Sequence, residues 1–100
     1  MSLEISKQQE GSVLKVALSG NLDTLTSPLL EAELDRGLDG VNELIFDFNK
    51  LDYISSAGLR VLLSAQKTMN AQGSMKITGV NETVGEIFEI TGFCDFLTIE

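Results

Sequence analysis

A five-residue run near the middle of the chain, Leu44-Ile45-Phe46-Asp47-Phe48, constrains the fold more than any other stretch. It is apolar on both faces of an extended chain, as expected of a central strand that is covered on two sides. Hydrophobic residues at helical spacing lie both before and after this run. Strands that alternate with helices predict an α/β fold with right-handed crossovers.

The other segments complete this alternation. In chain order, we expect a weak strand at 3–7, a strand at 14–18, a helix from residue 27, the central strand at 44–48, a helix at about 56–71, a strand at 75–78, a helix from about residue 83 and a strand at 96–99. The order β-β-α-β-α-β-α-β predicts a small α/β protein with a central mixed β-sheet of about five strands and packed helices. Because there is no linker, repeat or low-complexity tract, we expect a single domain over residues 1–100.

Capping patterns predict where two of these helices begin. Ser27 followed by Pro28 offers a helix cap and then proline at the first helical position. Thr83 and Glu86 can form a capping box for the last helix. The first helix is expected to bury an apolar stripe, which consists of Leu29, Leu30, Leu34 and Leu38.

The charge balance excludes several classes of function. Lys and Arg together number seven against fifteen Asp and Glu, which gives a net charge of −8. Nucleic acid is therefore not an expected partner, because its binding begins with neutralisation of phosphates by Lys and Arg. An anionic membrane surface is disfavoured for the same reason. Histidine, the commonest general base and metal ligand, is absent, so we expect neither an enzyme nor a metal or other cofactor.

The N-terminal residues and the single cysteine bear on location. The segment MSLEISKQQE has no apolar run long enough for a signal peptide or a membrane span, so we expect a cytoplasmic protein without membrane insertion. Cys94 has no second cysteine to pair with. Its place between Phe93 and Phe96 predicts a small buried hydrophobe.

The segment from Asp52 to Arg60 is the most unusual part of the chain, because it places two serines where a strand's exit loop meets a helix. On position alone, a helix cap is the favoured role for Ser55 or Ser56. However, the first turn that follows holds Ala57-Gly58-Leu59 and no acidic residue, so the positive helix end is open to an added anion. Glycine at position 58 is also expected to clear room beside the hydroxyl.

Several segments resemble the STAS domain of bacterial anti-sigma factor antagonists, and the likeness covers nearly the whole chain. They are Gly20-Asn21-Leu22-Asp23, Phe46-Asp47-Phe48 and Ile54-Ser55-Ser56-Ala57-Gly58-Leu59, together with the order of elements. The resemblance implies phosphorylation of Ser56, with Ser55 as a minor alternative, by an anti-sigma factor that is a GHKL-type serine kinase. It also implies a serine phosphatase that resets the site.

This sequence departs from the family pattern at one position. Ser55 stands where many members have Asp, so a carboxylate beside the phospho-acceptor is missing. Asp23, which the family geometry brings near the second helix, is a candidate to supply one. A role as an ordinary turn residue is an equal alternative for Asp23.

The resemblance therefore implies a binding module that holds the anti-sigma factor when unphosphorylated and releases it when phosphorylated. The partner-binding residues expected on this basis, with Leu22 or Tyr53 as apolar anchors, are Leu22, Asp23, Tyr53, Ser55, Ser56, Gly58, Arg60, Ser64 and Lys67. A constitutive STAS adaptor subunit, as in a lipid-transport complex, is the alternative without a phosphate cycle. A hydrolase that uses Ser56 is remote, because no histidine could activate it.

Overall fold

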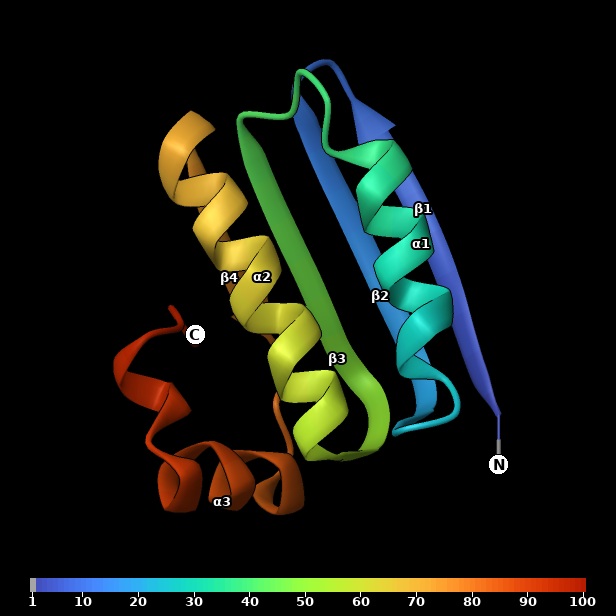
Figure 1. Cartoon of the computed structure of the whole chain (residues 1–100), viewed down its shortest axis with the longest axis vertical. Helices are drawn as coiled ribbons and strands as arrows, with labels where there is room; N and C mark the ends of the chain where they lie inside the picture. The colour runs from blue at the N-terminus through green and yellow to red at the C-terminus, as the bar shows by residue number, and fades with distance from the viewer. Residues whose placement is uncertain (1) are drawn as a thin grey trace.

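The computed structural model describes residues 2–100 and consists of one sheet with helices packed against it (Figure 1). Its elements, in chain order, are β1 (Leu3–Glu10), β2 (Val13–Leu22), α1 (Ser27–Gly37), β3 (Glu43–Ile54), α2 (Ser56–Gln72), β4 (Ser74–Thr78), α3 (Glu82–Thr91) and a short 3₁₀ turn, η1 (Phe93–Asp95). The predicted α/β class and the order of the first seven elements are confirmed.

The strands lie in the sheet in the order β1-β2-β3-β4. β1 pairs with β2 in antiparallel fashion, whereas β3 is parallel to both β2 and β4. The expected mixed sheet is therefore correct, with four strands in place of about five. The predicted strand at 96–99 is reduced to a single bridge between Ile77 and Ile99.

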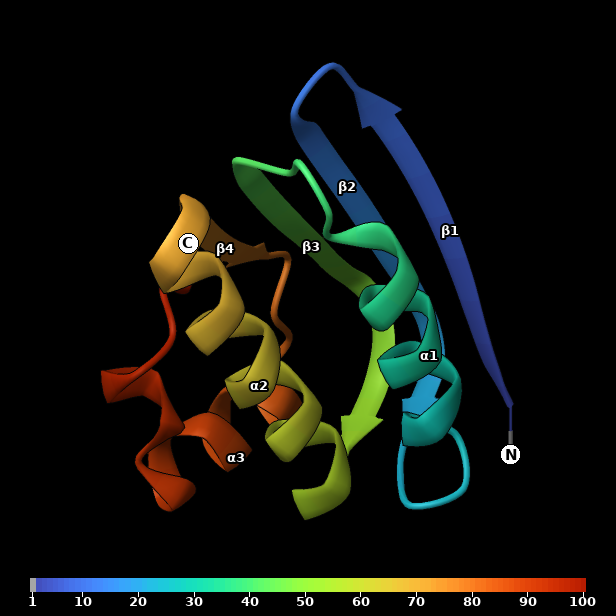
Figure 2. The same ribbon diagram turned by 45° about the horizontal axis from the view of Figure 1, so that its top comes forward.

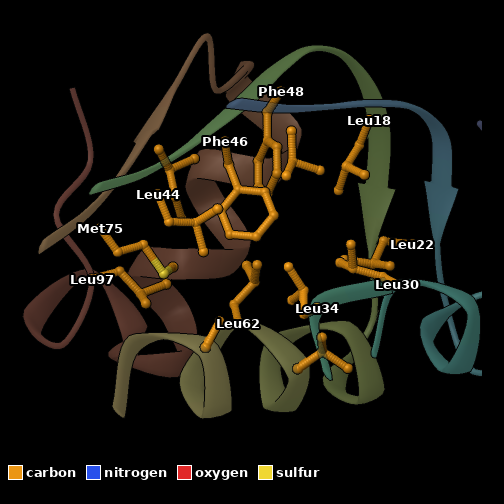
Figure 3. Packing of buried hydrophobic residues seen from close by; sticks show 14 of the residues in the cluster. Leu18, Leu22, Leu30, Leu34, Leu44, Phe46, Phe48, Leu62, Met75 and Leu97 are labelled. Atoms are coloured by element: carbon orange, nitrogen blue, oxygen red, sulfur yellow. The ribbon is translucent and has the colours of Figure 1, made fainter. Parts of the chain in front are cut away.

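Helices α1 and α2 lie side by side on one face of the sheet, as both ribbon views show (Figures 1 and 2). The side chains that alternate inward from β2 and β3, such as Leu18, Phe46 and Phe48, point toward these helices and are completely buried or nearly so (Figure 3). Val84 and Phe88 of α3 and Leu97 of the C-terminal segment join the same core.

The other face of β3 departs from the prediction. Ile45 and Asp47 point away from the core and are half-buried, so the central strand is not enclosed by helices on two sides. The reason is topological. The chain steps from β2 to β3 and then to β4 in one direction, and two right-handed crossovers in the same direction place both helices on the same face.

Two predicted helix starts are shifted. The N-cap of α1 is Thr26, and Ser27 is already helical, with its hydroxyl donating to the Asp23 carbonyl at 2.5 Å. The N-cap of α3 is Asn81, whose side chain accepts a hydrogen bond from the Val84 N–H at 2.8 Å. The predicted capping box at Thr83 was therefore placed two residues too late.

Two burial predictions were also wrong. Leu29 is 55% exposed, although it was placed in the buried stripe of α1. Cys94, predicted to be a buried hydrophobe, is exposed on the 3₁₀ turn.

Candidate functional site

The two loops of interest lie at the same edge of the sheet. Because β2 and β3 are parallel, their carboxyl ends coincide, with Leu22 opposite Ile54. The chain enters α1 from the end of β2 and enters α2 from the end of β3, so both helices begin at this edge (Figure 1). The Ser55 N–H donates to the Leu22 carbonyl at 2.9 Å, which ties the start of α2 directly to the end of β2.

Helix α2 begins with two serines that differ sharply. Ser55 is the N-cap residue, in extended conformation, but its side chain makes no capping hydrogen bond. Its Oγ is buried and has no hydrogen-bond partner among residues 2–100. Ser56 is the first helical residue and is exposed. Of the two hydroxyls, only that of Ser56 is presented to an enzyme from outside.

The N-terminus of α2 carries no compensating negative charge. The first turn holds no acidic residue, and the N–H groups of an initial helical turn have no partners within the helix. These groups and the helix dipole create a positive potential beside Ser56. This environment favours an anion at that position.

Gly58 has a different role from the one expected. It is buried, and a Cβ atom built there would lie 2.8 Å from Leu22 Cγ and 2.8 Å from Ile54 Cγ1. Glycine thus lets α2 approach the ends of β2 and β3 closely. The atoms nearest to such a Cβ belong to Leu22 and Ile54, so the packing role of this glycine is the one that the structure shows.

Asp23 serves the loop between β2 and α1. Its Oδ1 accepts hydrogen bonds from the N–H groups of Leu25 and Thr26, each at 3.0 Å, and from the Thr26 hydroxyl at 3.2 Å. The Thr26 N–H is the main cause of a lowered pKa for the Asp23 carboxyl, and the Leu25 N–H acts in the same direction. Of the two roles considered for Asp23, the turn role is therefore present in the structure.

The two apolar residues expected as anchors differ in exposure. Leu22 is completely buried, so it belongs to the core and cannot contact a partner in this conformation. Tyr53 is 42% exposed. Two residues that the sequence reasoning missed are more accessible, since Leu25 is 80% and Leu29 is 55% exposed. Leu30 and Leu34 already define the buried stripe of α1 at a spacing of four, and this spacing signals that Leu29 falls outside it.

The remaining predicted contacts share one face of α2. Arg60, Ser64 and Lys67 are all exposed and follow Ser56 at intervals of four, four and three residues. Such intervals place side chains on the same side of an α-helix. The structure therefore groups these residues in a single stripe with Ser56.

A surface hollow of about 380 Å³ lies away from this edge, on the open face of the sheet. Glu4, Ser19 and Asp47 are among its lining residues. None of the predicted partner-binding residues lines it. In residues 2–100 there is no group of three potential metal ligands and no helix long and apolar enough to cross a membrane.

The fold is thus a small α/β module, in which a mixed sheet with helices on one face presents an exposed helix start and a neighbouring loop at one edge. The STAS domain family model matches residues 4–100, and the chain belongs to this family. The resemblance inferred from the sequence is thereby confirmed.

Similar proteins share one named role. BtrV of Bordetella bronchiseptica, named as an anti-sigma factor antagonist, is 34% identical over 99 residues, which cover 97% of this chain and 85% of BtrV. An anti-sigma-B factor antagonist of Staphylococcus aureus is 30% identical over 101 residues, which cover 99% of this chain and 94% of that protein. Both relatives are thus matched over most of their length.

The fold is also similar to that of SpoIIAA of Bacillus, an anti-sigma factor antagonist solved in two forms. The unphosphorylated form gives a TM-score of 0.84 at 18% identity, covering 97% of this chain and 88% of that one. The phosphorylated form gives a TM-score of 0.75 at 17% identity, covering 97% and 91%. At these identities, the likeness establishes a shared fold.

Proposed function

We propose that this protein is an anti-sigma factor antagonist that works by partner switching. The unphosphorylated chain binds an anti-sigma factor that is also a GHKL-type serine kinase. The kinase phosphorylates Ser56 and the complex then dissociates, after which a serine phosphatase regenerates the binding form. The observation that carries this proposal is the exposed Ser56 hydroxyl at an uncapped helix start, in a chain whose relatives are named as anti-sigma factor antagonists.

In this scheme the protein is a substrate and a ligand, and the kinase is the catalyst. The kinase supplies ATP and Mg²⁺ and aligns the Ser56 Oγ with the γ-phosphorus. A bond forms from Oγ to phosphorus while the bond from phosphorus to the ADP oxygen breaks, and the serine proton passes to a base on the kinase. The exposed position of Ser56 supports such access without local unfolding.

The charge of the phosphate explains why binding would end. A phosphoserine carries roughly −1.5 to −2 charge near neutral pH. At the start of α2 this charge meets the positive end of the helix dipole, an interaction worth about 0.3–1 kcal/mol when exposed. At an interface, a mismatched buried charge typically costs about 2–5 kcal/mol. The cost at the interface is larger than the gain within the fold, so the modification weakens binding without unfolding the domain.

The test begins with the protein from its native cell. Tagged wild-type chain is isolated, resolved on a phosphate-affinity gel and mapped by fragment mass spectrometry. We expect one phosphate, on Ser56. Ser56→Ala should abolish the shifted band, whereas Ser74→Ala, which alters an exposed serine on β4 outside the expected interface, should keep it. Labelling that is mainly on Ser55 or on a serine outside this loop would refute the site.

The partner is tested separately. A serine kinase should co-purify with the Ser56→Ala chain and should not be released by ATP. Stable assembly with membrane-transport subunits, without any phosphorylated form, would instead favour the constitutive adaptor.

A further inference from the structure

We propose that Leu25 and Leu29 form the apolar anchor by which the anti-sigma factor grips this chain, and that Asp23 is a positioning residue that holds this anchor in place. This inference rests on the proposed function. The expected anchor Leu22 is buried, and Leu25 and Leu29, which are exposed to solvent at the same edge of the sheet, take its place in the proposal.

The two leucines lie close together in the chain, next to the start of α1. The Ser27 N–H donates to the Asp23 carbonyl at 2.8 Å, so the loop forms a single turn over residues 23–27, and the Leu29 N–H donates to the Thr26 carbonyl at 2.9 Å. Leu25, 80% exposed, and Leu29, 55% exposed, therefore lie on either side of the junction between this turn and α1.

This surface adjoins the phospho-acceptor site. It begins directly after Leu22, whose carbonyl accepts the Ser55 N–H at the start of α2. Figure 1 shows the loop before α1 and the start of α2 at the same end of the molecule. A partner that covers this end of the molecule around Ser56 would therefore also meet the anchor.

The charges around the anchor define the chemistry of the partner. Residues 16–35 contain no Lys or Arg, and they contain four acidic residues, Asp23, Glu31, Glu33 and Asp35. Glu33 is paired with Lys7 and Arg36, and the other three form no ion pair within residues 2–100. An exposed leucine pair within an acidic segment fits an apolar pocket that is bordered by Lys or Arg side chains. The partner surface is therefore expected to be apolar at its centre and basic at its rim.

Asp23 contributes through the loop conformation. Its Oδ1 accepts all three of the hydrogen bonds described above, from the Leu25 and Thr26 N–H groups and the Thr26 hydroxyl. The Thr26 hydroxyl donates in addition to the Asn21 carbonyl, and the Asp23 N–H donates back to the Thr26 Oγ1. This network fixes the backbone that carries Leu25. The role of Asp23 is therefore to orient a neighbour. An amide oxygen can accept the same hydrogen bonds, although it lacks the charge that strengthens them.

The experiment measures the dissociation constant for the kinase that co-purifies with the wild-type chain, expressed and purified, by titration calorimetry without ATP. Leu25→Ala and Leu29→Ala should each weaken binding by about tenfold or more, as truncated anchors do. The control is Ile90→Ala, which shortens an equally exposed residue (84%) on α3 and should leave the dissociation constant within about twofold. Thermal melts should show that the three variants remain folded.

The positioning role of Asp23 is tested by two substitutions that are expected to affect kinase binding differently. Asp23→Ala should weaken binding by about tenfold, whereas Asp23→Asn, which keeps the accepting oxygen, should stay within about threefold of wild type. In a Leu25→Ala background, Asp23→Ala should add less than about threefold, because its effect passes through Leu25.

The outcomes separate the two proposals. If no kinase binds the wild-type chain, the proposed function fails. If the kinase binds and both leucine variants match wild type, the anchor is refuted while the function stands. If Asp23→Asn binds as weakly as Asp23→Ala, the carboxylate charge contacts the partner directly and the positioning role is overturned.

Discussion

Gly58 shows how a single missing side chain sets the position of the site. The start of α2 rests directly on Leu22 and Ile54, and any Cβ at this point would meet both side chains. The depth at which α2 packs determines where Ser56 stands relative to the loop before α1. A buried residue without a side chain thus helps to fix the spacing between the two halves of the proposed surface.

Replacement of Gly58 by Ala is therefore expected to destabilise the protein. Helix propensity alone would favour Ala by about 1 kcal/mol, but overpacking of a filled core typically costs about 1–3 kcal/mol. We expect the free energy of unfolding to fall by about 1 kcal/mol in urea titrations.

Gly85→Ala in α3 is the matched control, because a Cβ there would lie 3.6 Å from Val80 Cγ1, an ordinary contact distance. This variant should gain about 0.5–1 kcal/mol. Equal gains in both variants would show that α2 does not pack as tightly as the structure indicates.

The pH dependence of the loop before α1 follows from Asp23. Hydrogen bonds from the Thr26 and Leu25 N–H groups lower its pKa in the folded state from the ordinary value of 3.8. A lowered folded-state pKa stabilises the fold above the ordinary value, and this contribution is lost as the pH falls through the folded-state pKa. The stability difference between wild type and Asp23→Asn should therefore shrink between about pH 5 and pH 2.

Chemical denaturation at several pH values measures this difference, and the subtraction removes the effect of all other carboxyl groups. A difference that stays constant over the same range would mean that the network does not depend on the charge of Asp23.

At the scale of elements, the exact residue at which a helix begins determines which polar side chains form capping hydrogen bonds. Asn81 caps α3 and also donates from Nδ2 to the Leu51 carbonyl at 2.8 Å, so it joins α3 to β3. Thr83 lies beyond the cap and is exposed. Asn81 therefore adds a polar link between α3 and the sheet to the packing of Val84 and Phe88, whereas Thr83 adds none.

Asn81→Ala should consequently lower the free energy of unfolding by about 1–2 kcal/mol, because it removes the cap and leaves the Leu51 carbonyl without this donor. For a chain of this length the melting temperature would fall by roughly 4–8 °C per kcal/mol. Thr83→Ala should change the stability by less than about 0.5 kcal/mol. A larger loss of stability for Thr83→Ala than for Asn81→Ala would instead support the capping box at Thr83 that the sequence suggested.

The sequence predicted the elements well and their boundaries less well, for identifiable reasons. Periodicity located β2 and α2, because burial of one face enforces it, and β3 was located by its continuous apolar run. The segment 96–99 also has a strand-like composition, but only Ile99 pairs with the sheet, and η1 occupies the chain just before it. The local sequence does not show whether the edge strand of the sheet is close enough for such a segment to pair with it.

The exposure of the candidate site residues was predictable to a similar degree. Ser56 is exposed, and so are Arg60, Ser64 and Lys67, which were expected on the exposed side of the same helix. The apolar neighbours were misassigned, since Leu22 is core and Leu25 is exposed. Nothing in the pattern of single residues distinguishes them, because their burial depends on the turn that Asp23 and Thr26 form between them.

The whole molecule behaves as a rigid support in the proposed mechanism. One continuous core joins the sheet, the three helices and Leu97. The phospho-acceptor lies outside this core, so a change of charge there has no buried group to displace. We therefore expect the switch to act on the surface alone.

Ser56→Asp, a mimic with less charge than a phosphate, should keep the melting temperature within a few degrees and weaken kinase binding by at least about tenfold. Amide NMR spectra of phosphorylated and unmodified protein provide the decisive comparison. Shifts should be confined to the Asp23 loop and the start of α2. Large shifts in α3 or around Ile99 would indicate that the modification refolds the domain.

The proposed anchor and the proposed phospho-acceptor lie at the same edge of the sheet but in two separate turns of the chain. The anchor follows β2, and Ser56 follows β3. Each turn can therefore change its sequence without disturbing the other, since the shared strands hold both in register. In a cell that contains several proteins of this family, mutations in the first turn would redirect a chain to another kinase while the chemistry of Ser56 stays intact. Signalling circuits could thus be duplicated and insulated from one another by altering a segment of about seven residues, 23–29.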